Sequence, residues 1–585
     1  MNILGYAALN HDPAVAVLAG PKVLCAIESE KVTRHKHEVN LFPEEAMRFA
    51  LQTAGLRLDD VDAIALNYDA GVWSNRLYLP HLGQLIRARN FDVDILTNMA
   101  VIGASHQRRV FKRLREYRIP RIVPVRHHLA HLASTYLFSP FDECAAAIID
   151  ASGELACTSL YHCAGRQYRE LYAMRLPNDS LGSVYMLATV HLGYRMIGDE
   201  YKVMGLAAFG QPHDRFRQFF LDLVRLEPEG RYRVNGRLAG RVFSNGWKFP
   251  RHVAEALGAQ RQPDGEFTQE HKDFAFELQR RLEEAIVHVT RHLRSITRSR
   301  RLCLAGGVAL NSVANGKVLE ESGFDELFIQ PAASDAGTAL GAAAFYHFFG
   351  QGGERPAPLR HAYLGPSYSN EYVAHELARC KQTFDTIDDP AGVAAELIAQ
   401  GRVIGWFQGA TEFGPRALGS RSILADPRRA GMRQVVNRLV KERESYRPFA
   451  PSILEDAAPE FLERITQSPF MLLVGKVRPD KRDVIPAVVH VDGTARPHTV
   501  SRSANPLFHA LISRFRDLTG VPVVLNTSFN VAGEPIVNSP LDALRCFHAS
   551  GLDALVIGNC IVRKDGCVEP HRPLETADAA GQLIT

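Results

Sequence analysis

The sequence predicts a two-domain α/β protein whose first domain consists of two related halves. A pattern of three strands joined by tight turns occupies residues 2–7, 14–19 and 22–28. The same pattern returns at residues 145–150, 156–163 and 167–176. An aspartate stands at the first turn both times, Asp12 and then Asp150. A Gly/Pro-rich stretch, residues 353–366, then separates domain 1–352 from domain 367–585, where the strand and helix patterns restart.

Two sheets with helices that face each other across a cleft are the layout of the actin/hexokinase-like ATPase fold. A duplicated architecture of this kind places a ligand between its halves. We therefore expect this fold, with duplicated halves, in the first domain.

Composition excludes several functional classes. The 585 residues are 46% hydrophobic and 23% charged, as in ordinary globular proteins. A net charge of +4 is small for this length and argues against a dedicated nucleic-acid binder. We see no signal peptide and no run of eighteen apolar residues, so we expect no membrane span and a cytoplasmic location. The nine cysteines form no CxxC pair, which argues against zinc fingers.

The remaining elements of the first domain follow from turn and periodicity signals. A helix begins at Pro43 and ends near Gly55, and an apolar stripe predicts a long helix from Thr268 to about Arg298. Residues 211–265, rich in Arg, Gly and Pro, are predicted to be an irregular insertion. A strand at residues 302–305 leads through Gly306-Gly307 into a helix from Val308. That junction is either a phosphate site or a plain turn.

The candidate ligand residues begin with two histidines. His127 and His131 follow a short strand at residues 121–125 and are four residues apart. On a helix they lie on one face, roughly 6 Å apart at Cβ, so that both can hold one metal ion. The alternative is a pair of surface or hydrogen-bonded histidines. Asp335, just before a helix of small residues, either caps that helix or points into the cleft.

A second polar cluster lies in the second domain, after a predicted helix that Gly401 ends and a strand at residues 403–407. Its basic residues stand among glycines, prolines and aromatics, whereas a solvated helix face would intersperse acids. Several Arg and Lys side chains with amide and hydroxyl donors suit a polyanion such as a nucleotide triphosphate or an acyl phosphate. The alternative is ordinary surface ion pairing. The residues concerned are Arg416, Arg421, Lys441, Arg443, Arg447, Arg496, Asn526 and Ser528.

Taken together, these motifs resemble the NodU/CmcH carbamoyltransferase family, which includes the tobramycin and cephalosporin O-carbamoyltransferases. The resemblance covers nearly the whole chain. Its markers are HDPA at 11–14, TRHKH at 33–37, HHLAHLAS at 127–134, DASGE at 150–154, DEYKVMGLAAFG at 199–210, GGVALN at 306–311, SDAGTALG at 334–341, FQGATEFGPRALGSRSILADPR at 407–428, RPFAPS at 447–452, DGTARP at 492–497 and NTSFN at 526–530.

The resemblance implies two catalytic domains. The second, a YrdC-like α/β domain, would form carbamoyl-adenylate and pyrophosphate from carbamoyl phosphate and ATP with Mg²⁺. The first would transfer the carbamoyl group to a hydroxyl of an acceptor and release AMP. The implied metal, Fe²⁺ or another divalent ion, would be held by His127, His131, Asp150 and Asp335. The implied substrate-binding residues in the second domain are Arg416, Lys441, Arg447, Arg496, Asn526 and Ser528, with Arg416 and Lys441 also catalytic.

Three further assignments rest on the same resemblance. His11 and Asp12 are candidate catalytic residues: His11 is the candidate base for the acceptor hydroxyl, with a structural histidine beside Asp12 as the alternative. Lys202 either meets the adenylate phosphate or pairs with Glu200 on the surface. Gly306, Gly307 and Asn311 would line the nucleotide. His128, between the two ligand histidines, is expected to face elsewhere.

The chain departs from the family pattern at a few positions. Ala151 stands where the family commonly has Gly, and Ala208 and Phe209 stand where Pro and Tyr are common. The run ESEKVTRHKH is less acidic than usual, which bears on the choice of acceptor. Residues 70–120 and 211–265 are expected to shape the acceptor pocket. The acceptor can be an aminoglycoside, a polyketide or another natural product, or a nodulation oligosaccharide. The sequence is also compatible with a homodimer.

The alternatives are a sugar kinase on the same fold, which would need neither the histidine pair nor the arginine cluster, and a non-catalytic regulatory homologue. A hydrogenase-maturation carbamoyl protein would carry an acylphosphatase domain and CxxC zinc fingers, which this sequence lacks.

Overall fold

In the computed structural model, the chain forms two compact units, Met1–Leu359 and Arg360–Thr585. The structure describes residues 1–8, 11–38, 42–69, 109–117, 121–154, 156–175, 179–240, 247–258, 260–263, 265–441, 443–444 and 446–564. Most of the predicted acceptor-shaping stretch at 70–120 lies outside these residues. The division between the units falls between a π-helical turn at Tyr346–Gly350 and helix α15 (Asn370–Arg379).

The first half of unit 1 is built on a five-stranded sheet in the order β3-β2-β1-β4-β5. Strands β1, β2 and β3 form an antiparallel meander, and β4 and β5 are added in parallel on the other side of β1. The elements are β1 (Asn2–Ala7), β2 (Ala14–Ala19), β3 (Lys22–Glu28), α1 (Ser29–Thr33), α2 (Glu44–Thr53), a 3₁₀ turn (Leu58–Asp60), β4 (Ala63–Leu66) and β5 (Ile122–Pro124).

The second half repeats this topology. Its sheet has the order β12-β11-β6-β7-β8, with β6, β7 and β8 antiparallel and β11 and β12 parallel to β6. The strands are β6 (Glu143–Ile149), β7 (Ala156–Ala164), β8 (Gln167–Arg175), β11 (Arg301–Ala305) and β12 (Glu326–Ile329). The predicted duplication, and with it the predicted α/β class, is therefore confirmed.

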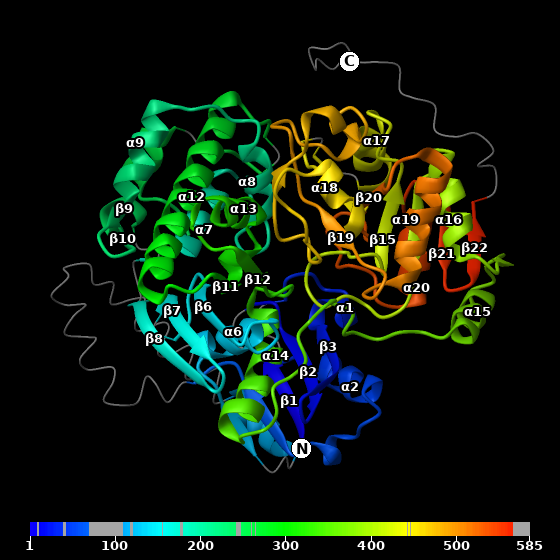
Figure 1. Ribbon diagram of the computed structural model, residues 1–585, viewed down its shortest axis with the longest axis horizontal. Coiled ribbons are helices and arrows are strands. Elements are labelled where there is room, and N and C mark those ends of the chain that lie inside the picture. Colours follow the sequence, from blue (N-terminus) through cyan, green and yellow to red (C-terminus); the bar gives the residue numbers. More distant parts are fainter. Residues whose placement is uncertain are drawn as a thin grey trace. The chain divides into compact units, whose positions relative to one another are not determined.

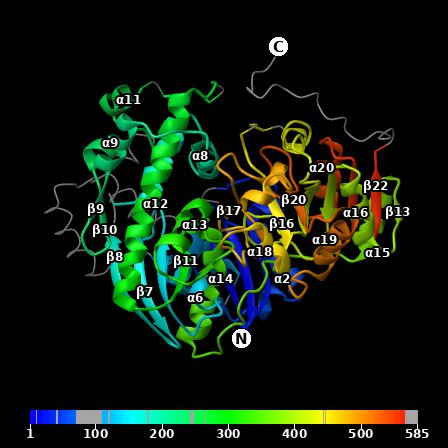
Figure 2. The ribbon, with the colours of Figure 1, turned by 45° about the horizontal axis from the view of Figure 1, so that its top comes forward.

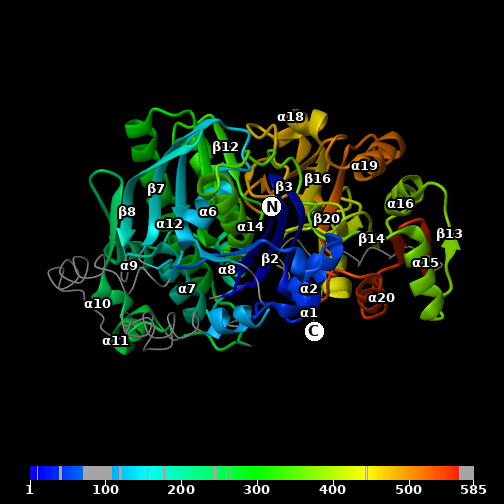
Figure 3. The same cartoon turned by 90° about the horizontal axis from the view of Figure 1, so that it is seen from below.

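A pair of buried helices joins the two halves. Helix α6 (His127–Tyr136) follows β5, and α14 (Asp335–Phe345) follows β12, so the two occupy equivalent places in the halves. Helix α14 packs on β1, β2 and β4, whereas α6 packs on β6, β7 and β11. The two helices also pack on each other, between the two sheets (Figures 1 and 3). Each helix is thereby anchored on the sheet of one half and against the helix of the other.

The segment between β8 and β11 is much longer than its counterpart between β3 and β4. Its backbone is the 29-residue helix α12 (Gln269–Thr297), which packs on α7, α8, α9 and α13 (Figure 2). Thr268 caps α12 and Arg298 ends it with a left-handed residue, as the sequence predicts. The other elements are α7 (Leu181–His191), α8 (Glu200–Ala207), α9 (Asp214–Leu223), β9 (Val224–Glu227), β10 (Arg231–Val234), α10 (Gly236–Ala239) and α11 (Arg251–Leu257).

Two sequence expectations in unit 1 are wrong. Residues 211–265 are not irregular, because they contain α9, the β9–β10 hairpin, α10 and α11. Phe216, Phe220 and Leu223 bury one face of α9, and the polar residues between them, such as Arg217 and Asp222, obscured this stripe. The helix after Gly306-Gly307 does not begin at Val308: a 3₁₀ turn (Gly307–Leu310) intervenes, and α13 (Ser312–Glu321) begins after the cap Asn311.

Unit 2 is built on an eight-stranded mixed sheet in the order β13-β22-β21-β14-β15-β20-β16-β19. The strands of this sheet are β13 (Asp385–Thr386), β14 (Ile404–Phe407), β15 (Arg421–Ala425), β16 (Ala450–Leu454), β19 (His498–Val500), β20 (Val523–Ser528), β21 (Ala554–Ile557) and β22 (Cys560–Arg563). The helices that follow α15 are α16 (Pro390–Ala399), α17 (Met432–Val435), α18 (Ala458–Phe461), α19 (Pro506–Thr519) and α20 (Pro540–His548). Two further short strands, β17 (Gly475–Lys476) and β18 (Thr494–Ala495), pair with each other.

Among the residues that the structure describes, no helix is long and apolar enough to cross a membrane.

The α6–α14 contact gives a prediction about stability. A Cβ atom on Gly341 of α14 would lie 1.8 Å from the backbone carbonyl oxygen of Ala130 on α6. Replacing Gly by Ala favours a helix by about 1 kcal/mol, but here it would force the two helices apart. We expect Gly341→Ala to destabilise the protein by about 1–3 kcal/mol, measured by chemical denaturation.

Gly431→Ala is the control, because Gly431 has a negative φ and open space around its Cβ position. A Gly341→Ala variant as stable as Gly431→Ala would show that the helices do not need this close approach.

Candidate functional site

The structure brings together the four residues predicted to hold a metal. His127 and His131 lie in the first two turns of α6, Asp150 follows β6, and Asp335 is the first residue of α14. Their ligand atoms all lie within 4.8 Å of one another, and all four residues are buried. The Nε2 atoms of the two histidines are 3.1 Å apart. Nε2 of His127 is 3.2 Å from Oδ2 of Asp150 and 3.3 Å from Oδ1 of Asp335.

The hydrogen bond on the far side of His127 determines how its ring meets the two carboxylates. Nδ1 of His127 lies 3.2 Å from the backbone carbonyl of Asn67, which can only accept, so Nδ1 carries the proton. In a neutral ring, Nε2 then presents a lone pair toward carboxylate oxygens that are also acceptors. Burial alone would lower the pKa of His127, but the charges of Asp335 and Asp150 raise it well above its ordinary value. The cluster therefore requires either protons or a cation.

This donor set fits a divalent transition metal. Two imidazole nitrogens and two carboxylate oxygens are a ligand combination that such ions accept. The hydrogen bond from a ligating histidine to a backbone carbonyl is the usual support of a metal-bound imidazole. His128, by contrast, directs Nδ1 to the hydroxyl of Ser159 at 2.7 Å, away from the four-residue cluster. Burial lowers the pKa of His128 to about 3, so it is neutral.

Glu154 supports the cluster from the N-terminus of α6. Both of its carboxylate oxygens accept hydrogen bonds from the backbone N–H of His127, at 2.8 and 3.0 Å. Oε1 also accepts from the N–H of Asp69 at 2.9 Å. A buried carboxylate at this helix end accepts a hydrogen bond from an N–H that has no partner within the helix. It also interacts favourably with the positive end of the helix dipole. This role of Glu154 is not predictable from its motif, because its partner His127 is 27 residues away in the chain.

The Gly306-Gly307 turn supports Asp150. The N–H of Gly307 donates to Oδ1 of Asp150 at 3.0 Å, so it serves a ligand carboxylate. Gly306 has φ 94°, and a Cβ there would lie 2.2 Å from the carbonyl oxygen of Ile149. Asn311, predicted to line a nucleotide, caps α13 through Ala314 and exchanges amide hydrogen bonds with Gln279.

A second polar group lies around Asp12. Nδ1 of His11 is 3.2 Å from Oδ2 of Asp12, and Nδ1 of His37 is 3.1 Å from Oδ1 of the same carboxylate. Burial alone would lower the pKa of His11, but Asp335 and Asp12 raise it to about 10. Asp12, with a left-handed φ of 52°, links both histidines. The sequence did not predict the contact of His37 with Asp12, because His37 was known only as part of the TRHKH motif.

Lys202 does not pair with Glu200. Nζ of Lys202 is 2.9 Å from Oδ1 of Asp199, one turn earlier, and lies over the ring of Tyr194. The carboxylate of Glu200 accepts instead from the backbone N–H groups of Ile197 and Gly198. The alternative of an ion pair for Lys202 therefore named the wrong partner, since Lys202 pairs with Asp199 and not with Glu200.

Unit 2 contains a cluster of arginines. The pKa of Arg496 is held well below its usual range by burial and then by the like charges of Arg416, Arg443 and Arg447. Nε of Arg496 is buried and has no hydrogen-bond partner among the residues that the structure describes. Such a concentration of positive charge favours the binding of an anion.

Other predicted members of the unit 2 site support the backbone around it. Nζ of Lys441 donates to the carbonyl oxygens of Ser528 and Asn530 at 2.9 and 2.7 Å. Nδ2 of Asn526 donates to the carbonyl of Ala417, in the loop that carries Arg416. Arg421 is fully buried over the ring of Phe407, and its N–H groups donate to backbone carbonyls.

Comparison with known proteins identifies the family. Residues 2–344 match the family model described as Carbamoyltransferase N-terminus, and residues 395–564 match Carbamoyltransferase C-terminus. The chain belongs to the carbamoyltransferase family, which confirms the resemblance seen in its motifs, and it is an enzyme of that class.

Several curated relatives are nodulation proteins. The chain is 40% identical to nodulation protein NolNO of Sinorhizobium fredii, over 95% of this chain and 79% of the relative. It is 44% identical to nodulation protein NolO of Bradyrhizobium diazoefficiens, over 75% of this chain and 78% of the relative. Among solved structures, HypF of T. kodakarensis aligns at 14% identity with a TM-score of 0.32, over 60% of this chain and 48% of that one.

The four-residue cluster gives a prediction about metal content. We expect the purified protein to bind about one divalent transition metal per chain, measured by elemental analysis. Asp335→Asn removes a charged ligand at nearly constant volume, so affinity should fall by more than the roughly 10–100-fold that loss of an outer-shell partner costs.

His128→Gln is the control, because this side chain faces Ser159 and its replacement should leave the metal content unchanged. Equal metal content in Asp335→Asn and the wild type would contradict the site.

The environment of His11 predicts a pH-dependent contribution to stability in the metal-free protein. The pKa of His11 is raised from 6.5 to about 10, so its ion pairing stabilises the folded state fully below pH 6.5. That contribution is lost as the pH rises through 10. The melting temperature of His11→Asn should therefore be a few degrees below that of the wild type at pH 6, with a difference that shrinks toward pH 10.

His252→Asn, at an exposed position of α11, controls for loss of a histidine in itself. A difference that stays constant from pH 6 to pH 10 would assign the effect to packing of the ring rather than to its charge.

Proposed function

We propose that the protein is an ATP-dependent O-carbamoyltransferase that activates a carbamoyl group in unit 2 and transfers it to a hydroxylated acceptor in unit 1. The observation that carries this proposal is the concentration of half-buried positive charge around Arg496, whose Nε atom is buried. Family membership supplies the carbamoyl chemistry, and this charge supplies the reason for a polyanionic substrate. Carbamoyl phosphate and ATP, with Mg²⁺, are the proposed substrates of unit 2.

The balance of atoms defines the first half-reaction. Carbamoyl phosphate must first lose its phosphate to water, which leaves carbamate. A carbamate oxygen then attacks the α-phosphorus of ATP, and the bond to the β,γ-phosphates breaks. The products are carbamoyl-adenylate, pyrophosphate and one inorganic phosphate. Arg416, Arg447 and Arg496 would stabilise the charge that develops on the phosphoryl oxygens and on the leaving pyrophosphate. Lys441, Asn526 and Ser528 would hold the loops that carry or face this site.

The second half-reaction is proposed for the cluster in unit 1. His127, His131, Asp150 and Asp335 would hold a divalent metal, iron or another, which when bound supplies Lewis acidity and positive charge to the phosphoryl oxygens of the adenylate. Gly306, Gly307 and Lys202 are the proposed neighbours of the nucleotide. The acceptor oxygen attacks the carbamoyl carbon, the bond from that carbon to the AMP oxygen breaks, and AMP leaves.

His11 is the proposed base for this transfer. Asp12 accepts a hydrogen bond from Nδ1 of His11, so Nε2 is the nitrogen that can take the proton of the acceptor hydroxyl. The charge of Asp335 is a main cause of the raised pKa of His11. When that charge is compensated by a bound cation, the pKa of His11 falls toward the range in which its neutral form is present near pH 7.

The two half-reactions can be separated by mutation. Arg496→Ala should reduce the formation of pyrophosphate from ATP and carbamoyl phosphate by about 100-fold or more, since it removes a charge-stabilising donor. It should leave the folding stability unchanged or increased, because it relieves repulsion among four arginines. Asp335→Asn should retain pyrophosphate formation but lose transfer to the acceptor. Release of phosphate, pyrophosphate and AMP is measured by ion-exchange chromatography.

Arg545→Ala, at an exposed position of α20, is the matched control. Sugar-dependent release of ADP without pyrophosphate would instead identify a kinase, and no turnover of either kind would favour a regulatory protein.

A further inference from the structure

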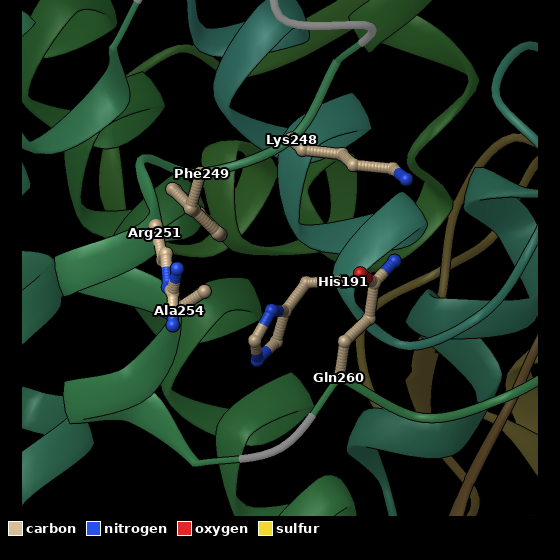
Figure 4. A pocket seen from close by; sticks show the side chains of 6 residues that line it. All are labelled: His191, Lys248, Phe249, Arg251, Ala254 and Gln260. Carbon is tan, nitrogen blue, oxygen red and sulfur yellow. The ribbon is translucent and has the colours of Figure 1, made fainter.

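A cavity of about 270 Å³ lies at the C-terminal end of α7 in unit 1 (Figure 4). None of the residues assigned to the reaction lines it. One wall is formed by α11 and the two residues that precede Pro250, and the opposite wall by Gln260. Its lining consists of His191, Lys248, Phe249, Arg251, Ala254 and Gln260.

His191 is the central group of this cavity. Its side chain is only 8% exposed and packs against Phe249 and Phe274, with ring centroids 5.6 and 5.1 Å away. The contacts of its ring with the residues that the structure describes are these aromatic ones, without a side-chain hydrogen bond. In Figure 4 the imidazole points into the space between α11 and Gln260. The ring nitrogens are therefore left to the contents of the cavity, where water or the hydrogen-bonding groups of a ligand can meet them.

The chemistry of the lining suits hydroxyl groups. Burial, and then the charge of His271, lowers the pKa of His191 to about 4, so the ring is neutral with one donor and one acceptor nitrogen. Gln260 donates one amide hydrogen to the carbonyl of Val190 and keeps its oxygen and second hydrogen for a ligand. Phe249 and Ala254 add apolar surface, and Lys248 and Arg251 bring donors to the rim. A hydroxyl both donates and accepts, whereas a phosphate accepts and would select a protonated histidine.

We propose that this cavity binds one saccharide ring of the acceptor and anchors it at a distance from the reaction. This inference rests on the proposed transfer to a hydroxylated acceptor, and it names the acceptor class as an oligosaccharide or a glycosylated compound. A saccharide ring presents adjacent hydroxyls at its edge and C–H groups on its face, which match the polar and apolar parts of the lining.

Helix α7 determines the distance between this cavity and the four-residue cluster. At its N-terminus, the hydroxyl of Ser180 donates to the carbonyl of Ala151, the neighbour of the ligand Asp150. At its C-terminus, His191 faces the cavity. Eleven helical residues at 1.5 Å each separate the two ends by about 16 Å. An acceptor with one ring in the cavity therefore reaches the four-residue cluster only if it is several rings long.

The test uses the full-length protein and two ladders of linear probes, chito-oligosaccharides and cello-oligosaccharides, from monosaccharide to pentasaccharide. Binding is measured by saturation-transfer difference NMR and calorimetry. We expect binding in at least one ladder, with the strongest transfer to one terminal ring. His191→Phe keeps the ring packing but removes two hydrogen-bonding atoms, and Gln260→Ala removes the amide. Each should weaken binding about tenfold, equivalent to about 1.4 kcal/mol.

His252→Ala is the matched control, since His252 is exposed on the same helix as Arg251 but does not line the cavity. Absence of binding in both ladders, equal binding by His191→Phe and the wild type, or competition by inorganic phosphate at millimolar concentration would each overturn the inference.

Pyrophosphate formation is measured in parallel without any acceptor. It should be unchanged in all three variants, because the cavity takes no part in the first half-reaction. Loss of saccharide binding with pyrophosphate formation intact overturns this inference alone. Saccharide binding without pyrophosphate formation contradicts the proposed function and leaves the cavity as a saccharide site.

Discussion

The close crossing of α6 and α14 is the contact on which the cluster in unit 1 depends. Each helix follows the last strand of its half, and each packs on the sheet of the other half. His127 and His131 come from one helix and Asp335 from the other, so the distance between the helices sets the distance between ligands. Gly341 allows this approach because a Cβ there would meet the backbone of α6. The duplication thus produces both the fold and the place where the metal-binding side chains of the two helices meet.

The two units concentrate charge of opposite sign, buried in unit 1 and half-buried in unit 2. In unit 1, Asp150, Asp335 and Glu154 concentrate negative charge around the first turn of α6. In unit 2, Arg496 lies among three other arginines. Buried charges of one sign are costly unless a partner compensates them. A cation in the first site and phosphate groups in the second are the complementary partners. Uncompensated charge makes each site costly in free energy when it is empty. A ligand of opposite charge removes this cost, which increases the affinity of the site for that ligand.

Local patterns predicted most of the fold, and long-range contacts account for the errors. The first three strands, the duplicated meander and the bounds of α12 follow from turn residues and periodicity, which act within a few positions. The spacing of His127 and His131 placed them on one helix face. The roles of Glu154 and Asn67 depend on contacts with His127 across 27 and 60 residues, which no local signal encodes. The helices of residues 211–265 were missed because charged residues interrupt their apolar faces.

Comparison of the two halves shows where specificity can change without altering the chemistry. The connection from β3 to β4 contains only α1, α2 and a 3₁₀ turn in its described part, whereas that from β8 to β11 contains α7 to α12 and the β9–β10 hairpin. The extra segment contributes no ligand to the four-residue cluster, but it forms the walls of the cavity around His191. In the proposed function, substitutions in α11 or at Gln260 would change which acceptor is held, while α6 and α14 keep His127, His131 and Asp335 in place. The length of α7 would then select acceptors whose reactive hydroxyl lies at a fixed distance from the anchored ring.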